Sequence, residues 1–578
     1  INLAAKMRIL VIGAGASGLV TAKTLREAGH EVRIVEASST IGGTFENKAY
    51  KDARMVSSKY LTCFSDFRRP EAEMHMTLKD YVLYLREYAA HFGISELIRF
   101  NVKVINVQKG CNTKDSYEVT LQGDGDDSHP SVEVWDAVAV CSGLHNVPRI
   151  PDFPGQEKFA GQILHSSNYK DPEIFKDRKV LIIGTGETAF DLGYAAATHG
   201  AQSVTMSTRH GFVSVPACFG ENNPPLDCVI MNWATHAWES QWAQRVGMHW
   251  WVTTKFTRMG FLLTTGCSYG FNQWVGKRYN MTWDDGRKHI VNKSSKCMPL
   301  LSRAAKKKTS WLRRKIYSWM DGEYNDIPLD IDLVEGSVVE LQPNGVLHKT
   351  NATGELRHVE ADLVLLATGY RQRFPFLCGA GDMEDPLPQQ HFLVDPAHPR
   401  LSYIGFIRPN VGAIPPMAEM QAMWWCRLLA NEVKEGNPLD STCYRLTDSR
   451  LCYGVDYGYY MFALAKEIGA APCLRYWFWQ NWRIMLTCAF GQAHVPIFRL
   501  QGPFRSAACQ ATCSTELYNV LWTRPLVMNL TFLIEALAFG VINGVAVLLE
   551  SARGRSLVGM GLGVLTLVSF GSSSKVFR

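Results

Sequence analysis

The sequence predicts an α/β fold with two dinucleotide-binding Rossmann-like domains and a hydrophobic segment near the C-terminal end. Two glycine-rich sequences, at residues 13–18 and 184–189, each follow a short apolar run and open a helix-like stretch. Residues 525–549 form an apolar run with only four polar interruptions. The two glycine-rich sequences predict the two domains, and the apolar run predicts a membrane segment.

The first glycine-rich sequence is Gly13-x-Gly15-x-x-Gly18. Gly13 permits a tight turn, Gly15 lets the backbone approach a pyrophosphate, and Gly18 allows a helix to pack closely. The helix N-terminus adds unpaired N–H groups and positive potential, which favour an anion. The next strand-like run ends at Glu36, at the distance expected of a carboxylate that binds ribose hydroxyls. The alternative is an ordinary glycine-rich turn.

The second sequence, Gly184-x-Gly186-x-x-Ala189, repeats this order of strand, turn and helix. Its following strand ends without an acid, and Thr208-Arg209 stands in that place. A guanidinium there can hold a 2′-phosphate through two hydrogen bonds, so NADPH is favoured over NADH. The alternative for Arg209 is a solvated surface arginine.

Composition excludes several other classes of protein. The chain has 578 residues, 47% of them hydrophobic and 20% charged, which is typical of a globular protein with a large core. A net charge of +6 gives no support for nucleic-acid binding. The 15 cysteines include no CxxC pair and no zinc-like spacing, so neither a redox dithiol nor a metal site is expected. A reducing compartment such as the cytosol suits this chain.

Between the two glycine-rich sequences lies the pattern Phe159-x-Gly161-x-x-x-His165-x-x-x-Tyr169. With two dinucleotide sites around it, the chain resembles the flavin-containing monooxygenases, which this pattern identifies. Related Baeyer–Villiger monooxygenases usually carry Trp followed by Pro or Asp at its end, where this chain has Tyr169-Lys170. The amine- and sulfide-oxidising branch is therefore favoured. We expect His165 to be a structural residue at the junction between domains.

The resemblance covers nearly the whole chain and implies a reaction. NADPH reduces FAD, and reduced FAD traps dioxygen as a C4a-hydroperoxide that gives one oxygen atom to nitrogen or sulfur of a small lipophilic amine or sulfide, as in N,N-dimethylaniline oxidation. Two other reactions stay open: Baeyer–Villiger oxygenation, and NADPH oxidation that yields hydrogen peroxide. A non-catalytic protein that only binds FAD and NADPH is the remaining alternative. Further matching stretches are Ile41-Gly42-Gly43, Phe64-Ser65-Asp66-Phe67, Cys141-Ser142-Gly143, Ala367-Thr368-Gly369-Tyr370 and 405–421.

One departure from the family bears on the reaction. Animal members usually carry Asn three residues before Lys59, and here that position is Val56. The family's Asn is thought to hydrogen-bond near the flavin reaction centre, and valine can neither donate nor accept. Ser57 or Ser58 is a possible substitute, and leakage to hydrogen peroxide is the expected symptom if neither serves. Phe45 replaces a family Trp and keeps an aromatic face.

The expected site follows from the two fingerprints and the resemblance. Lys59 is an expected NADP⁺ contact, with a surface role as the alternative. The cofactor-binding residues are expected to be Gly13, Ala14, Gly15, Ala16, Ser17, Gly18, Glu36, Gly43, Thr44, Phe45, Ser57, Lys59, Gly184, Thr185, Gly186, Glu187, Thr188, Ala189, Arg209, Thr368 and Gly369. No metal ligand and no protein nucleophile are expected.

The resemblance also suggests a discontinuous organisation. We expect an FAD-binding domain over 5–155 and 336–520, interrupted by an NADPH-binding domain over 156–335. Residues 525–570 are the expected membrane-anchoring tail, in which Glu535 costs roughly 2.5 to 3.5 kcal/mol, less than the apolar side chains contribute. The body is then cytosolic, and the resemblance implies the endoplasmic reticulum. Basic and aromatic residues interleave within 306–319, which fits either an anionic membrane surface or a solvated face.

Overall fold

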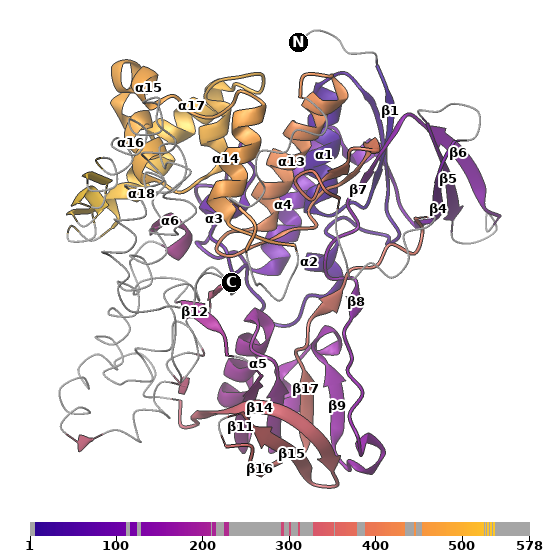
Figure 1. Cartoon of the computed structure of the whole chain (residues 1–578), viewed down its shortest axis with the longest axis vertical. Helices are drawn as coiled ribbons and strands as arrows, with labels where there is room; N and C mark the ends of the chain where they lie inside the picture. The colour runs from indigo at the N-terminus through magenta and orange to yellow at the C-terminus, as the bar shows by residue number, and fades with distance from the viewer. Residues whose placement is uncertain are drawn as a thin grey trace, which may run out of the picture.

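The first of two large sheets has β1 (Arg8–Ile12) at its centre (Figure 1). Its strand order is β19-β20-β7-β1-β2-β3, and β1 pairs in parallel with both β2 (Glu31–Val35) and β7 (Ala137–Val140). Four of the five β1 residues are buried, as expected for a central parallel strand covered on both faces. This computed structural model describes residues 6–110, 116–123, 129–209, 211–215, 225–229, 291–293, 297, 300–301, 310–311, 327–351, 353–377, 388–433, 444–446, 453–524, 526, 529–530, 532–534, 536–537 and 541.

Helices cover this sheet, and a small antiparallel sheet flanks it. Helix α1 (Ala16–Glu27) buries one side against α13 (Ile414–Leu429), although nearly 400 residues separate them along the chain. The other elements of this part are α2 (Thr44–Asn47), α3 (Lys59–Thr62), α4 (Leu78–His91), η1 (Ser95–Leu97), β3 (Ile98–Arg99), β4 (Val102–Lys109), β5 (Tyr117–Gly123), β6 (Ser131–Trp135), β19 (Val394–Asp395), β20 (His398–Tyr403), β21 (Arg408–Pro409) and β22 (Gly454–Val455).

The second sheet lies below the first in Figure 1 and has the order β16-β15-β14-β11-β10-β17-β9. Its strands from β14 to β9 are parallel, and β15 and β16 add an antiparallel edge. Its elements are β9 (Gln162–His165), η3 (Ser166–Asn168), η4 (Pro172–Phe175), β10 (Lys179–Ile183), α5 (Glu187–Thr198), β11 (Ser203–Thr208), β14 (Ile331–Gln342), β15 (Gly345–Thr350), β16 (Leu356–Glu360) and β17 (Leu363–Leu366).

This topology corrects one expected boundary. The sequence predicts that the first domain resumes at residue 336, but β14, β15, β16 and β17 all belong to the second sheet. β17 pairs in parallel with β10 on one side and β9 on the other, so it is an inner strand of the second sheet. The chain returns to the first sheet only at β19 and β20, after Leu366. The strand-like run 363–366 carries no signal that tells which of two parallel sheets it joins.

Two short stretches connect the domains. β8 (Val147–Pro148) and β18 (Tyr370–Arg371) pair antiparallel where the chain leaves the first sheet and where it returns. β8 lies between the upper and lower parts in Figure 1. Two further short strands, β12 (Val213–Val215) and β13 (Val291–Lys293), pair in parallel beside the second sheet.

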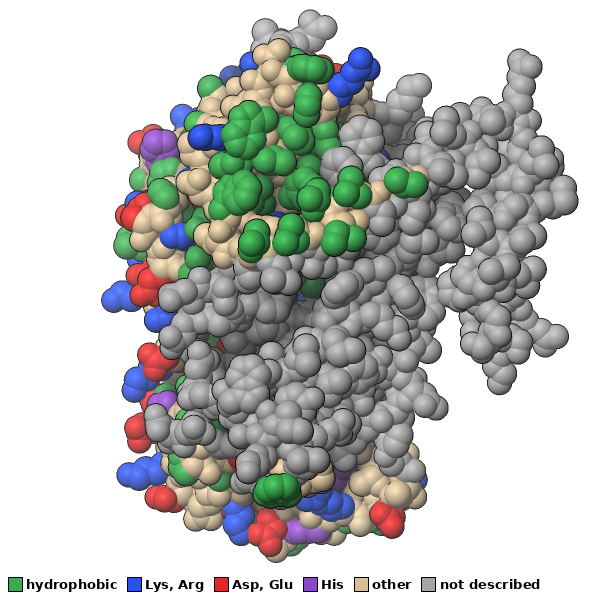
Figure 2. All heavy atoms as spheres, turned by 90° about the vertical axis from the view of Figure 1, so that its left-hand side faces the viewer, with side chains coloured by type: hydrophobic (Ala, Val, Ile, Leu, Met, Phe, Trp, Pro, Cys, Tyr) green, Lys and Arg blue, Asp and Glu red, His purple; other side chains and the backbone are tan. Residues whose placement is uncertain are grey.

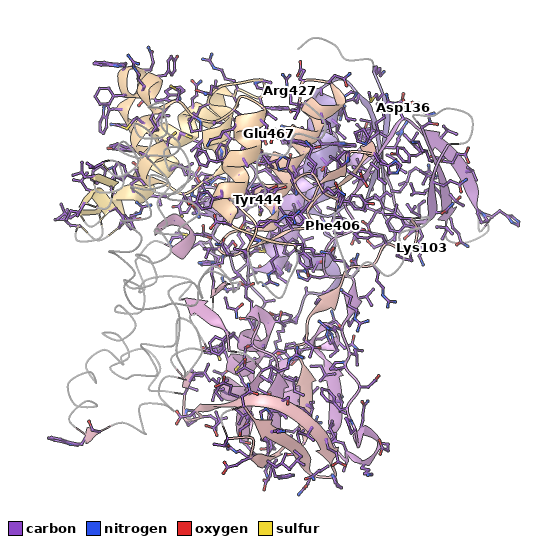
Figure 3. All side chains as sticks on the ribbon, viewed as in Figure 1. Lys103, Asp136, Phe406, Arg427, Tyr444 and Glu467 are labelled. Carbon is purple, nitrogen blue, oxygen red and sulfur yellow. The ribbon has the colours of Figure 1, made fainter. Side chains whose placement is uncertain are left out.

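Helices of the C-terminal part pack against the first domain. A buried cluster helps to hold them: His391 hydrogen-bonds the Tyr444 hydroxyl at 3.0 Å and the Glu467 carboxylate at 2.9 Å. Figure 3 labels Tyr444 and Glu467. The elements of this part are α14 (Tyr457–Glu467), α15 (Leu474–Gln480), α16 (Trp482–Phe490), η7 (Val495–Arg499), α17 (Ala507–Ser514) and α18 (Glu516–Trp522), and the short helix α6 (Leu226–Val229), from the middle of the chain, contacts α18. No helix in the described part of the chain has both the length and the hydrophobicity to cross a bilayer. The expected tail, 525–570, lies mostly outside the described residues.

Candidate functional site

The first glycine-rich turn has the geometry of a pyrophosphate cradle. Gly13 has a φ of +109°, and a Cβ there would stand 2.7 Å from the Cys141 carbonyl oxygen. A Cβ on Gly18 would stand 1.9 Å from the Gly13 oxygen, so both positions require glycine. A Cβ on Gly15 would have the Gly43 Cα, at 3.8 Å, as its nearest atom. No side chain caps the N-terminus of helix α1. The open space and the unpaired helix N–H groups fit an anionic cofactor.

Glu36 lies beside this turn, as predicted. Its Oε2 accepts a hydrogen bond from the Ala14 N–H at 2.7 Å, and its Oε1 accepts from the Ser38 N–H and hydroxyl. These three bonds use three of the about four acceptor positions of the carboxylate, so Oε2 can accept one more hydrogen bond. Gly43 closes over the turn with a φ of +56° and begins α2, which carries Thr44 and Phe45.

The second turn repeats the cradle in the other sheet. Gly184 has a φ of +121°, and a Cβ there would stand 2.3 Å from the Ala367 carbonyl oxygen. A Cβ on Gly186 would meet no atom within 4 Å, and no side chain caps α5. Thr185 and Thr208 hydroxyls lie 3.2 Å apart, which places exposed Arg209 at the same edge of the sheet. That location suits a 2′-phosphate contact.

His165 joins the two domains rather than facing an open site. Its Nδ1 accepts a hydrogen bond from the Ser167 N–H at 3.1 Å, so in the neutral ring the proton lies on Nε2, which donates to the Gly369 carbonyl at 3.2 Å. Burial lowers the pKa of His165, which keeps the ring neutral. The Gly369 oxygen also accepts from the Arg149 N–H at 2.9 Å, and the Thr368 hydroxyl donates to the Arg149 carbonyl. Both connecting stretches are therefore fixed at one point.

The other motif residues are structural as well. Phe159 and Tyr169 are buried, and a Cβ on Gly161 would stand 2.4 Å from the Asp362 carbonyl oxygen. The Tyr169 ring packs against Tyr50 of the first domain at 5.4 Å between centroids. The motif thus fastens the second domain to the first.

Around Val56 the structure separates the two serines. The Ser57 hydroxyl donates to the Gly412 carbonyl at 3.3 Å, while the fully buried Ser58 hydroxyl lies 3.8 Å from the Cys228 sulfur. The Lys59 ammonium donates to the Pro70 and Ala72 carbonyls and so fastens a loop of its own domain.

Sequence reasoning missed three polar residues near these serines. The Lys293 ammonium donates to the Ser57 hydroxyl at 2.7 Å, and Asp227 accepts from the Ser58 N–H at 2.8 Å. Asn292 donates to the Thr185 carbonyl at 2.5 Å. All three are buried, and they come from segments between 218 and 319 in which no fingerprint was found. Asp227 is an acid inside a short apolar stretch, whereas Asn292 and Lys293 stand in a polar one, and neither pattern is specific enough to identify them as site residues.

With this geometry in place, the family follows. The model of the family "Flavin-binding monooxygenase-like" matches residues 6–260 and 321–549. The chain belongs to this family. It is a flavin-dependent monooxygenase whose cofactors are FAD and NADP(H), as the two cradles predict, and it acts on dioxygen and an organic substrate.

Curated relatives match over most of their length. Monooxygenase ptmN of Penicillium ochrochloron is 34% identical, with 91% of this chain and 92% of the relative covered. Flavin-containing monooxygenase 5 of Cavia porcellus is 29% identical, with 86% and 89% covered. The predicted resemblance to the animal enzymes is thereby confirmed.

Solved structures show the same fold. The S-allyl-L-cysteine S-oxygenase from Allium sativum is similar with a TM-score of 0.52 at 20% identity, covering 82% of this chain and 92% of that one. A steroid monooxygenase bound to NADP also gives 0.52 at 17% identity, with 80% and 97% covered. The predicted pair of Rossmann-like sheets is confirmed.

Proposed function

We propose that this monooxygenase transfers one oxygen atom from O2 to nitrogen or sulfur of small lipophilic amines or sulfides. The observation that carries the proposal is the motif end Tyr169-Lys170, which differs from the Baeyer–Villiger pattern. In the structure Tyr169 packs on Tyr50, and the Lys170 ammonium donates to the Ala49 carbonyl at 2.9 Å. The similarity to animal flavin-containing monooxygenases over 86% of the chain supports the same branch.

The residues of the site have definable tasks. FAD supplies the activation of dioxygen once NADPH has reduced it. The first cradle and Glu36 hold the FAD phosphates and ribose, and the second cradle and Arg209 hold NADPH. The clamp of His165 on Gly369 orients one cradle toward the other, which hydride transfer between the two cofactors requires.

The proposal is tested with three substrates under identical conditions: N,N-dimethylaniline, methyl phenyl sulfide and phenylacetone. Oxygenated product, NADPH consumed and hydrogen peroxide are measured together. An N-oxide or sulfoxide formed nearly once per NADPH supports the proposal. An ester from the ketone identifies Baeyer–Villiger oxygenation instead, and hydrogen peroxide equal to NADPH, with no product, identifies an oxidase. Failure of NADPH to bleach the flavin leaves only a binding protein.

We further propose that the protein binds a membrane, for which the endoplasmic reticulum is the proposed organelle and the cytosol the location of the body. Support comes from an exposed apolar surface on the C-terminal helices (Figure 2). Trp and Tyr are typical of bilayer interfaces, and exposed Arg475 and Arg483 beside them suit anionic lipids. This aromatic surface consists of Tyr476, Phe478, Trp479, Trp482 and Trp522, continued by Leu526, Leu530, Leu533, Ile534, Leu537 and Val541.

Spacing within the continuation also favours a membrane. Its exposed residues recur every three or four positions from 526 to 541, where the described residues are helical. One apolar stripe of a helix therefore faces outward, as in helices that lie in a bilayer interface. Apolar side chains gathered on one face in this way are typical of an interaction site.

Flotation with phosphatidylcholine vesicles, with and without phosphatidylserine, tests this second proposal. We expect the full chain to float with the vesicles, more strongly with the anionic lipid. Deletion from Pro525 onward and the double variant W479Q/W482Q should each weaken flotation, while Leu83→Gln, on α4 outside the aromatic surface, should not. A full chain that stays at the bottom of the gradient overturns the proposal.

A further inference from the structure

Lys293 is a buried cation whose partners come from separate segments of the chain. Its side chain is 4% exposed, and its Nζ lies 2.7 Å from the Ser57 Oγ, 3.4 Å from the Gly412 carbonyl oxygen and 3.8 Å from the Asp227 Oδ2. Removing a charge from water costs several kcal/mol, so a buried lysine persists only when its surroundings compensate it. The oxygen atoms of Ser57, Gly412 and Asp227 provide this compensation for the buried ammonium.

Strand β13 gives Lys293 its place between the two cradles. Successive side chains of a strand point to opposite faces. Asn292 bonds the Thr185 carbonyl, which belongs to the second glycine-rich turn, and Lys293 bonds Ser57, which belongs to the first domain. Two consecutive residues thus connect the NADPH cradle with the segment that carries Val56. The ammonium lies where the two dinucleotide domains meet.

The partners leave part of the ammonium uncommitted. An ammonium has three hydrogens, and Ser57 and Gly412 accept two of them. Asp227 is directed to the Ser58 N–H at 2.8 Å, and its 3.8 Å separation from Nζ is longer than a hydrogen bond. Among the described residues no other acceptor is bonded to Lys293. The positive charge of Lys293 is therefore only partly neutralised by its partners, and its electrostatic field extends to neighbouring groups.

We propose that Lys293 is a positioning residue of the cofactor junction, which orients the Ser57 hydroxyl and brings a positive charge toward the bound flavin. A nearby cation favours the electron-rich reduced flavin over the oxidised one. The remaining hydrogen of this ammonium supplies a hydrogen-bond donor near Val56, whose side chain has none. This inference rests on the proposed function only for its effect on oxygenation, because its effect on the flavin potential needs no substrate.

The midpoint potential of bound FAD tests this proposal, measured in the full-length holoprotein against a reference dye. In Lys293→Met we expect reduced FAD to bind about tenfold more weakly relative to oxidised FAD, which appears as a more negative potential. Lys293→Arg keeps the charge and should restore most of the potential. The double variant K293M/D227N leaves no unpaired buried charge, so it should fold even where K293M does not, and its potential should lie between those of K293M and the wild type.

A matched control separates charge placement from general damage. Lys23 is also a buried lysine, 5% exposed and paired with a carboxylate, Asp66, but it lies two turns along α1 from the first cradle. Lys23→Met should lower thermal stability and leave the flavin potential unchanged. Equal potentials in wild type, K293M and the double variant, or equal shifts in K23M and K293M, overturn the proposal. A protein that shows the predicted potentials but oxygenates no substrate contradicts the proposed function and leaves this inference intact.

Discussion

At the scale of single residues, the site combines predictable and unpredictable positions. Gly13, Glu36 and Arg209 were predicted because their roles follow from local order along the chain: strand, turn, helix and strand end. Lys293 and Asp227 were not, because their function arises only when β13 and α6 are folded against Ser57 and Ser58. Sequence patterns that dictate backbone geometry predict site residues well. An isolated polar residue carries almost no sequence signal of its role.

We propose that Arg209 sets the choice between NADPH and NADH. Arg209→Ala removes the only charge at the end of β11 that we assign to the 2′-phosphate, and charge-assisted hydrogen bonds contribute about 1.5–3 kcal/mol. We therefore expect the KM for NADPH to rise at least about tenfold while that for NADH stays nearly constant. Steady-state kinetics with both nucleotides measures this, and Arg357→Ala on β16 serves as the control. Equal effects on both nucleotides contradict the assignment.

His494 makes stability depend on pH. Burial lowers its pKa to about 3, with the Arg68 guanidinium adding to the effect, and its Nδ1 has no hydrogen-bond partner among the described residues. The unfolded ring has a pKa near 6.5, so the folded state is favoured fully above that pH and loses stability as pH falls toward 3. From this group alone the loss by pH 5 is about 2 kcal/mol.

The test is the fall in Tm between pH 7 and pH 5. His494→Asn has no group that titrates in this range, so its Tm should fall less than that of the wild type. The control is His199→Asn, at an exposed position. Its Tm should fall between pH 7 and pH 5 by as much as the Tm of the wild type does. A wild-type Tm that does not change over this interval would show that His494 is accessible to protons without cost.

At the scale of elements, the two cradles share a design and differ at the third position of the fingerprint, which is Gly18 in the first and Ala189 in the second. Both strand–turn–helix units form as the sequence predicts, because the turn glycines and the buried strand before them are local features. The boundary at 336 was predicted wrongly because membership of β14 to β17 in one sheet is decided by pairing over a long sequence distance. Pairing of that kind leaves no local pattern in the chain.

A pair of alanine substitutions separates a glycine that faces the cofactor from a glycine that faces the protein. A Cβ on Gly186 meets no protein atom, so Gly186→Ala should keep the Tm of the FAD-loaded protein, yet its methyl group occupies the space that the pyrophosphate approaches. We expect NADP⁺ affinity to fall about tenfold, measured by quenching of flavin fluorescence. Gly18→Ala places a Cβ 1.9 Å from the Gly13 oxygen and should yield protein without FAD. Normal FAD content in Gly18→Ala would refute the packing argument.

At the scale of the whole molecule, function depends on how the two domains are held. Three contacts between them lie at or beside the motif: Tyr169 on Tyr50, His165 on Gly369, and the Tyr50 hydroxyl, which donates to the Asp191 carboxylate of α5 at 2.6 Å. Burial, and then Asp191, raise the pKa of Tyr50, so the hydroxyl stays a donor. The family pattern thus identifies residues that hold the two domains together rather than residues that react.

Tyr50→Phe tests this joint. It removes one donor and leaves both cradles intact, so NADP⁺ affinity should stay constant. Hydride transfer depends on the relative placement of the two cofactors, and we expect the rate of flavin bleaching by NADPH in a stopped-flow instrument to fall roughly tenfold. Tyr81→Phe is the control, because that buried hydroxyl has no partner among the described residues. An unchanged rate in Tyr50→Phe would show that the other contacts suffice.

Strand β20 pairs with β7, so the first sheet cannot close until the chain has been made as far as Tyr403. A ribosome adds roughly 5 to 20 residues per second, which puts tens of seconds between the emergence of β7 and the arrival of its neighbour. During that time a wholly apolar strand has a bare edge, the kind of surface that nucleates aggregation. The insertion of the second domain therefore leaves this edge of newly synthesised protein exposed to aggregation until β20 arrives.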